Sequence, residues 1–255
     1  NTVREIAGEK AGIIVPGVPV IYDGNDKDAA EVIAAKAKEL GSPAYKVVQA
    51  GAKVLGNNKD GIDFSLEDDY YGDTRFHIPF IAWYQVMNAS LALTTMEVLK
   101  DRIPVTMEQL QAGIANTRWQ GRMETILPGV IVDGAHNEDG VRRFVETAER
   151  FQKEYPLTLL FSAVNDKDYQ DMIHTICSRI KFRKVVTTEV GGYREVPSAE
   201  LAEIFCKEGC KDIGNSDNIE EAFHMAHEAK GEDGMLFCVG SLYLVGEIKT
   251  LLLKK

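Results

Sequence analysis

The feature that most constrains the fold of this chain is the alternation of strand-sized apolar runs with helical patterns from about residue 119 onward. The predicted strands cover residues 130–133, 157–163, 184–189 and 235–239, with a weaker one around 211–214. The predicted helices cover residues 140–155, 169–180, 199–208, 219–230 and a terminal segment from about 242. Strands joined through helices pair in parallel, so this order predicts an α/β fold: a mostly parallel sheet with helices on both faces.

The region before residue 119 is less regular, and we place a domain boundary between residues 118 and 119. Helical spacing predicts a short helix around Ile6 and longer ones over 28–40, 85–99 and from about Thr106, where Thr106 to Gln109 resembles a capping box. Strands are expected at 18–22 and 45–49. Between residues 51 and 79, short alternating pieces separated by Gly and Asp turns predict a small antiparallel patch.

Composition excludes some classes of partner. The 255 residues carry a formal net charge of −10, which argues against a nucleic-acid or anionic-membrane partner because phosphate groups are bound by excess Lys and Arg. The four cysteines, Cys177, Cys206, Cys210 and Cys238, lack the paired spacing of a zinc site. Without a signal segment or a membrane-length apolar run, we expect reduced thiols and a cytoplasmic location.

Polar side chains follow the predicted strands of the second region. Asp133, His136 and Asn137 come after the first strand, Lys167 after the second and Ser241 after the last. Because the carboxyl ends of parallel strands meet at one edge of the sheet, these loops predict a single ligand-binding site for a polar, phosphorylated ligand.

A purely structural interpretation of these residues stays open. Asn137 or Asp133 can satisfy backbone N–H groups, and Asp168 and Ser241 can cap the helices that follow them. Lys167 fits that interpretation less well, because a cation in the first turn opposes the helix dipole unless an anion lies nearby.

Several segments together resemble one family. They are IAGEKAGII at 6–14, QVMNASLAL at 85–93, WQGRME at 119–124, DGAHN at 133–137, NDKD at 165–168 and GSLYLVGE at 240–247. In order and in type they resemble the motifs of folylpolyglutamate synthase and dihydrofolate synthase, members of the Mur ligase superfamily. The resemblance implies that residues 1–118 form the later part of an ATP-binding domain and residues 119–255 a Rossmann-like glutamate-ligase domain.

The resemblance also implies an activity. Members of this family are ATP-dependent amide ligases that phosphorylate the carboxylate of a folate or dihydropteroate and let the amine of L-glutamate attack the acyl phosphate. ATP and Mg²⁺ are therefore the implied cofactors, because crowded phosphates need neutralising charge. Folate or dihydropteroate, glutamate and ATP are the implied small-molecule partners, and the intact enzyme is expected to be monomeric.

Residue roles follow from the same resemblance. On the nucleotide side, Asn88 is similar to the residue that reads adenine, Arg122 to one that contacts the ATP phosphates, and Asp133 to one that holds the ribose hydroxyls. On the glutamate side, His136 matches a histidine near the reacting phosphate and the incoming glutamate. The other residues implied at the glutamate pocket are Ser241, Lys167 and, by a looser match, Arg194.

Lys10 matches a family lysine that CO₂ can carbamylate. Carbamylation removes the positive charge and supplies two oxygens that suit Mg²⁺, so Lys10 would be both a catalytic residue and a metal ligand. The alternative is a surface lysine at a helix end that pairs with exposed carbonyls.

The sequence also departs from the family pattern. Tyr84 stands where the family usually has His before Gln85, and no glycine-rich loop ending in Gly-Lys-Ser is present to hold phosphates. We therefore expect an incomplete ligase chain that is inactive alone. Two other interpretations stay open: a non-catalytic α/β binding module, and a cell-wall Mur ligase, against which the folate-type motifs at 133–137 and 240–247 argue.

Overall fold

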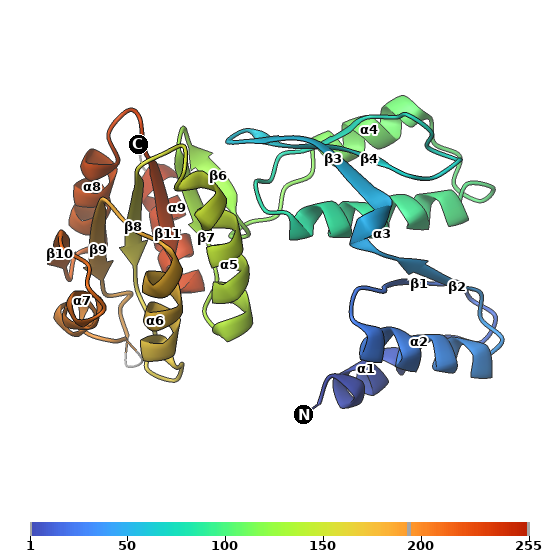
Figure 1. Cartoon of the computed structure of the whole chain (residues 1–255), viewed down its shortest axis with the longest axis horizontal. Helices are drawn as coiled ribbons and strands as arrows, with labels where there is room; N and C mark the ends of the chain where they lie inside the picture. Colours follow the sequence, from blue (N-terminus) through green and yellow to red (C-terminus); the bar gives the residue numbers. More distant parts are fainter. Residues whose placement is uncertain (1, 193–194, 254–255) are drawn as a thin grey trace. The chain divides into compact units, whose positions relative to one another are not determined.

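The computed structural model describes residues 2–192 and 195–253 and divides the chain into two compact units, Asn1–Arg118 and Trp119–Lys255 (Figure 1). We call them unit 1 and unit 2. Within the described ranges, every helix is too short or too polar to cross a bilayer.

Unit 2 contains the predicted sheet. Its elements are β6 (Glu124–Leu127), β7 (Val130–Asp133), α5 (Glu138–Phe151), β8 (Leu157–Phe161), α6 (Tyr169–Arg179), β9 (Lys184–Thr188), α7 (Ser198–Lys207), β10 (Ile213–Ser216), α8 (Ile219–Lys230), β11 (Met235–Val239) and α9 (Leu242–Leu253). The strand order is β10-β9-β8-β11-β7-β6, and every pairing is parallel except β6 with β7. The prediction of a mostly parallel α/β sheet is confirmed.

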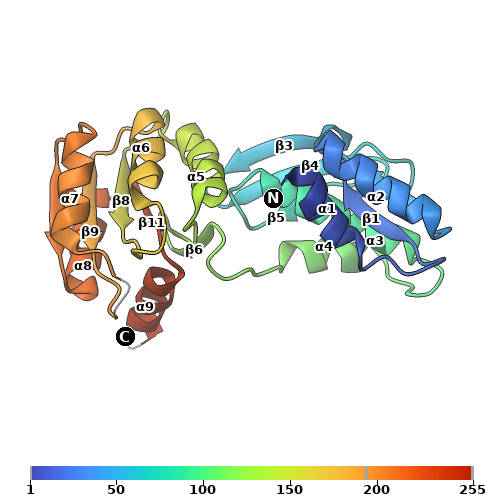
Figure 2. The same cartoon turned by 90° about the horizontal axis from the view of Figure 1, so that it is seen from below.

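The two faces of this sheet are covered by different helices. Alternate residues such as Val132 and Leu160 pack with α8 and α9, whereas Phe237 and Phe161 point to the other face and meet Phe144 of α5 and Phe205 of α7. Figure 2 shows α5, α6 and α7 on one side of the strands and α8 and α9 on the other. Burial on both faces explains why these strands have continuous apolar sequences.

Sequence analysis missed strand β6. Only part of its surface is buried, and the β6–β7 register shifts between Thr125 and Leu127, so no clear apolar period marks it. Helix α5 begins at Glu138 rather than residue 140, because the Asn137 side chain caps it by accepting from Gly140 N. The weakly predicted strand lies two residues later, at Ile213–Ser216.

Unit 1 contains two small sheets. Its elements are α1 (Val3–Ala11), β1 (Val20–Asp23), α2 (Lys27–Glu39), β2 (Ala44–Val47), η1 (Gln49–Gly51), β3 (Ala52–Asn58), β4 (Gly61–Leu66), β5 (Phe76–Ile78), α3 (Tyr84–Val98) and α4 (Met107–Ala115). Strands β1 and β2 pair in parallel, and β3, β4 and β5 form the predicted antiparallel patch. The main core of unit 1 packs that patch against α3 and α4 through Phe64, Phe76, Val86, Leu93 and Leu110.

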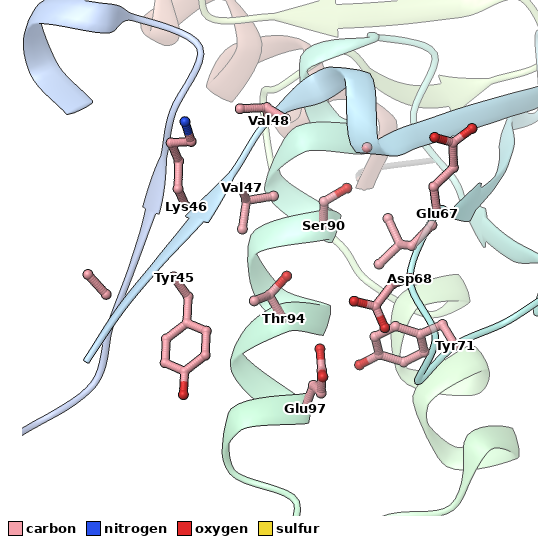
Figure 3. Close-up of a pocket in the computed structure, with 13 residues that line it drawn as sticks. Tyr45, Lys46, Val47, Val48, Glu67, Asp68, Tyr71, Ser90, Thr94 and Glu97 are labelled. Atoms are coloured by element: carbon pink, nitrogen blue, oxygen red, sulfur yellow. The ribbon is translucent and has the colours of Figure 1, made fainter. Parts of the chain in front are cut away.

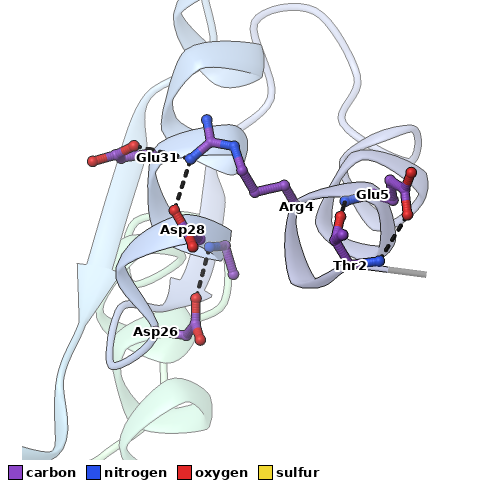
Figure 4. A network of polar contacts seen from close by, with 7 residues as sticks. Thr2, Arg4, Glu5, Asp26, Asp28 and Glu31 are labelled. Carbon is purple, nitrogen blue, oxygen red and sulfur yellow. Dashed lines mark hydrogen bonds and ion pairs between the residues drawn. The ribbon is translucent and has the colours of Figure 1, made fainter.

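The helix ends of unit 1 are fixed by local hydrogen bonds. The predicted capping box at Thr106 and Gln109 is present, and α1 begins with another, formed by Thr2 and Glu5. Arg4 on α1 pairs with Asp28 and Glu31 on α2 (Figure 4). These ion pairs are exposed, so packing rather than charge holds the two helices together.

Candidate functional site

Three loops of unit 2 meet at one edge of the sheet. Strands β7, β11 and β8 are neighbours and run in parallel, so their carboxyl ends place Asp133 to Asn137, Gly240 with Ser241, and Ser162 to Asp168 side by side. Strand β9, which ends at Thr188, lies next to β8. The last strand, β11, returns to lie between β7 and β8, so strand order along the sheet no longer follows sequence order here, and ligands of open α/β sheets bind at such switch points.

Asp133 lies at the centre of the β7 turn and is only 4% exposed. Its two carboxylate oxygens accept hydrogen bonds from Met123 N and Ala135 N, each at 2.8 Å. Burial raises the pKa of Asp133 to about 6, against the opposing effects of these bonds and of the nearby Arg122 and His136 charges. The carboxylate thus joins the segment around Arg122 to the DGAHN turn, in keeping with the structural interpretation of this residue.

The His136 ring is oriented by its own turn. Its Nδ1 lies 2.7 Å from Gly134 O, and a carbonyl only accepts, so Nδ1 carries a hydrogen; in the neutral tautomer with this hydrogen, Nε2 is the acceptor. Gly134 N donates to Gly121 O at 2.8 Å. A Cβ at Gly134 would lie 2.2 Å from Leu242 Cδ2, so a larger residue there would require the exposed Leu242 side chain to move.

The segment beside Arg122 is strained and tightly held. Met123 has φ +47°, which is unusual for a non-glycine residue, and its side chain is fully buried. Glu124 accepts from Gly121 N at 2.8 Å and from Lys249 Nζ of α9 at 2.7 Å. Arg122 is half-buried and lies close enough to Asp133 to lower its pKa. Sequence analysis missed Met123 and Lys249; the WQGRME motif marked the segment but not its backbone conformation.

The end of β11 approaches the end of β8 very closely. Gly240 has φ +110°, and a Cβ there would lie 2.0 Å from Ser162 O. Ser241 is 2% exposed, and its Oγ accepts from Tyr243 N at 3.1 Å, which is the local contact of a helix cap. The Ser162 hydroxyl is buried and has no hydrogen-bond partner among the described residues.

The loop after β8 supplies Lys167. Asp168 caps α6 by accepting from Asp171 N, as the structural interpretation expected, and Lys167 is exposed directly before it. The structure therefore brings Lys167, His136 and Ser241 to one edge of the sheet. Arg194 lies outside the described residues.

The predicted site residues of unit 1 are exposed. Asn88 lies on α3, and its Nδ2 donates to Gln85 Oε1 at 2.8 Å; Gln85 is buried, and its Nε2 has no partner among the described residues. Lys10 is in the last turn of α1. No group of three or more His, Cys, Asp or Glu residues in the described ranges is arranged to hold a metal ion. The metal role of Lys10 stays a prediction.

Unit 1 also has a hollow of about 420 Å³ between β2, α3 and the end of β4. Figure 3 shows Lys46 on one side and the carboxylates of Glu67, Asp68 and Glu97 on the other. Burial and the neighbouring Asp68 raise the pKa of Glu97. Three carboxylates against one ammonium do not suit a phosphate, and none of the predicted site residues lines this hollow.

The chain is similar to known proteins over nearly its whole length. The profile of the "Mur ligase, glutamate ligase domain" matches residues 121–242. A dihydrofolate synthase/folylpolyglutamate synthase from Bacillus subtilis is 31% identical over 98% of this chain and 58% of its own length. The folylpolyglutamate synthase structure from Thermotoga maritima has a TM-score of 0.80 at 25% identity, covering 99% of this chain and 58% of that one.

A further structure, a folylpolyglutamate synthase in complex with AMPPCP, has a TM-score of 0.73 at 27% identity and covers 99% of this chain and 58% of that one. The chain thus spans a little over half the length of the relatives it matches. The strand order, the motif-bearing turns of unit 2 and these similarities agree: residues 121–242 match the glutamate ligase domain of Mur ligases, and the chain as a whole is similar to folylpolyglutamate and dihydrofolate synthases.

Proposed function

We propose that this chain is the glutamate-ligating part of an ATP-dependent ligase that adds L-glutamate to a folate or to dihydropteroate through an acyl phosphate, and that it is inactive alone. The observation that carries the proposal is the meeting of the family motifs at the carboxyl ends of β7, β11 and β8. Residues 1–118 would contribute the later part of the ATP-binding domain.

On the nucleotide side, ATP would supply the phosphoryl group that activates the acceptor carboxylate. Arg122, held beside Asp133 by the Met123 N–H bond, would neutralise phosphate charge. Asp133 already accepts two backbone N–H groups, so ribose hydroxyls would use the remaining lone pairs of its oxygens. Asn88 would read the adenine, with Gln85 holding its amide.

On the glutamate side, the oriented ring of His136 supports a direct role. Because Nδ1 donates to Gly134 O, Nε2 would accept a proton from the attacking amine. Lys167 would pair with a glutamate carboxylate, and the Ser241 hydroxyl would donate a hydrogen bond to it. Arg194 would act at the same pocket.

The test uses a chimera, because the chain covers only 58% of the B. subtilis relative. This chain replaces the matching part of that relative, and the product is assayed for ATP-dependent and glutamate-dependent elongation of tetrahydrofolate and dihydropteroate. We expect activity, and a loss of about 100-fold or more in kcat/KM in Arg122→Ala and His136→Ala.

The matched control is Arg142→Ala. Arg142 is exposed on α5 and pairs with Asp139, so its removal should leave kcat/KM unchanged. A folded chimera that binds neither AMPPCP nor glutamate and forms no amide would instead support the non-catalytic binding module. Preference for a uridine-diphosphate peptide precursor would support the cell-wall ligase.

A further inference from the structure

Two cysteines of unit 2 lie side by side although they are 33 positions apart. Cys177 is near the end of α6, and Cys210 lies between α7 and β10. Their sulfur atoms are 3.7 Å apart, within hydrogen-bonding distance for a thiol pair. A disulfide bond is about 2.05 Å long, so the sulfurs must approach by roughly 1.7 Å for a bond to form.

The other two cysteines have different surroundings. Cys206 is exposed on α7, and Cys238 is completely buried in β11. Burial raises the pKa of Cys238, which keeps that thiol protonated. Among the four cysteines, only Cys177 and Cys210 combine partial exposure with a neighbouring sulfur.

Both cysteines are half-buried and border the protein surface. Cys177 and Cys210 line one surface hollow of about 570 Å³, which Lys181, Arg183 and Lys211 also line. The acidic Glu208 and Asp212 line it as well, and the Glu208 charge raises the pKa of both thiols. The hydrogen bond from Cys177 lowers the pKa of Cys210, and the same bond raises the pKa of Cys177. Cys210 is therefore the more acidic thiol of the pair and the one that more readily becomes a thiolate.

We propose that Cys177 and Cys210 form a redox site in which a peroxide converts the two thiols into a reversible disulfide that joins α6 to the loop before β10. The Cys210 thiolate attacks one oxygen of hydrogen peroxide, the O–O bond breaks, and with one proton the products are a Cys210 sulfenic acid and water. The Cys177 sulfur then displaces the sulfenic oxygen, which leaves as a second water with the Cys177 proton. Sulfur loses two electrons and peroxide gains them.

The cysteine pair lies near the amino ends of the strands of unit 2, whereas the predicted ligase residues lie at the carboxyl ends. Helix α6 starts after the carboxyl end of β8 and runs back, so Cys177 lies toward the amino ends of the strands, and Cys210 directly precedes the amino end of β10. The disulfide would therefore stabilise unit 2 without contacting the proposed glutamate pocket, and its test is independent of ligase activity.

The experiment treats the whole chain with a few equivalents of hydrogen peroxide, alkylates the remaining thiols and maps peptides by mass spectrometry. We expect one linked pair of peptides containing Cys177 and Cys210, a loss of two hydrogen atoms, and reversal by dithiothreitol. The thermal midpoint of unit 2 should rise by about 5 °C or more on oxidation, because the crosslink closes a long loop.

Variants separate the two roles. Cys206→Ser should form the same linked pair, whereas Cys177→Ser should accumulate a Cys210 sulfenic acid that dimedone traps. If a variant fails to fold, the peptide mapping of the unsubstituted chain still shows whether Cys177 and Cys210 are linked. Full alkylation of both cysteines after peroxide, or crosslinking only through Cys206 between chains, would overturn the proposal.

Discussion

The two units of this protein contain parallel strands of very different burial. In unit 2, every residue of β8 and β11 is buried, and helices cover both faces of the sheet. In unit 1, β2 is almost entirely exposed, β1 is only partly buried, and Ile13, Val15 and Val18 nearby are exposed apolar residues. Parallel sheets are normally buried on both faces. The main difference between the two units is therefore how completely helices cover their parallel strands.

The largest expected effect tests the packing of glycine in the two units. Gly240→Ala should prevent folding of unit 2 or lower its free energy of unfolding by about 5 kcal/mol, because the new methyl would overlap Ser162 O. Gly41→Ala in unit 1 is the matched control: Gly41 also has a positive φ, but no atom lies within 4 Å of its Cβ position, so the loss should be about 1 kcal/mol. Denaturant unfolding measures the loss of unfolding free energy in both variants. Equal losses would show that Gly240 is no more tightly packed than Gly41.

The next effect concerns pH. Asp133 has its pKa raised to about 6 in the folded chain, above the unfolded value, so its contribution to stability is complete below about pH 4 and is lost as pH rises through about 6. The free energy of unfolding of the native chain relative to Asp133→Asn should fall by about 3 kcal/mol between pH 4 and pH 7.

The control for that measurement lies in unit 1. The pKa of Glu97 is also raised, mainly by burial, so Glu97→Gln should change the pH dependence in the same direction and by less. Urea unfolding at a series of pH values measures both variants. If the free energy of unfolding of the native chain, relative to that of Asp133→Asn, instead rises with pH, Asp133 is ionised in the folded chain well below pH 6.

A smaller effect tests the strained backbone at Met123. Glycine tolerates the observed positive φ, so Met123→Gly should be more stable than Met123→Ala by about 0.5–1 kcal/mol. In an ordinary helix the order is the reverse, and Ala37→Gly on α2 of unit 1 should lose about 1 kcal/mol. Chemical unfolding of the three variants measures whether glycine is more stable than alanine at position 123 and less stable at position 37.

The smallest expected effects compare two ion pairs. Lys249→Ala removes the half-buried pair with Glu124 in unit 2 and should cost about 1 kcal/mol. Arg4→Ala removes the exposed pairs with Asp28 and Glu31 in unit 1, and the thermal midpoint should stay unchanged within error at both low and high salt. A salt-sensitive loss at Arg4 larger than that at Lys249 would reverse the comparison.

Most secondary structure followed from local rules. The apolar runs predicted β7, β8, β9 and β11, and capping chemistry predicted the start of α4 at Thr106. Strand β6 could not be predicted, because it is short, half-exposed and stabilised by pairing with β7 rather than by its own pattern.

By itself, the sequence determined the order of the elements other than β6, the family motifs and the residue types at the strand ends, since these depend on local period and spacing. Only the tertiary structure decided that β11 inserts between β7 and β8, that Asp133 is buried with both oxygens bonded, and that Met123 is left-handed. It alone also paired Cys177 with Cys210. The reason is physical: strand order, burial and the approach of distant side chains depend on long-range packing, which no local pattern specifies.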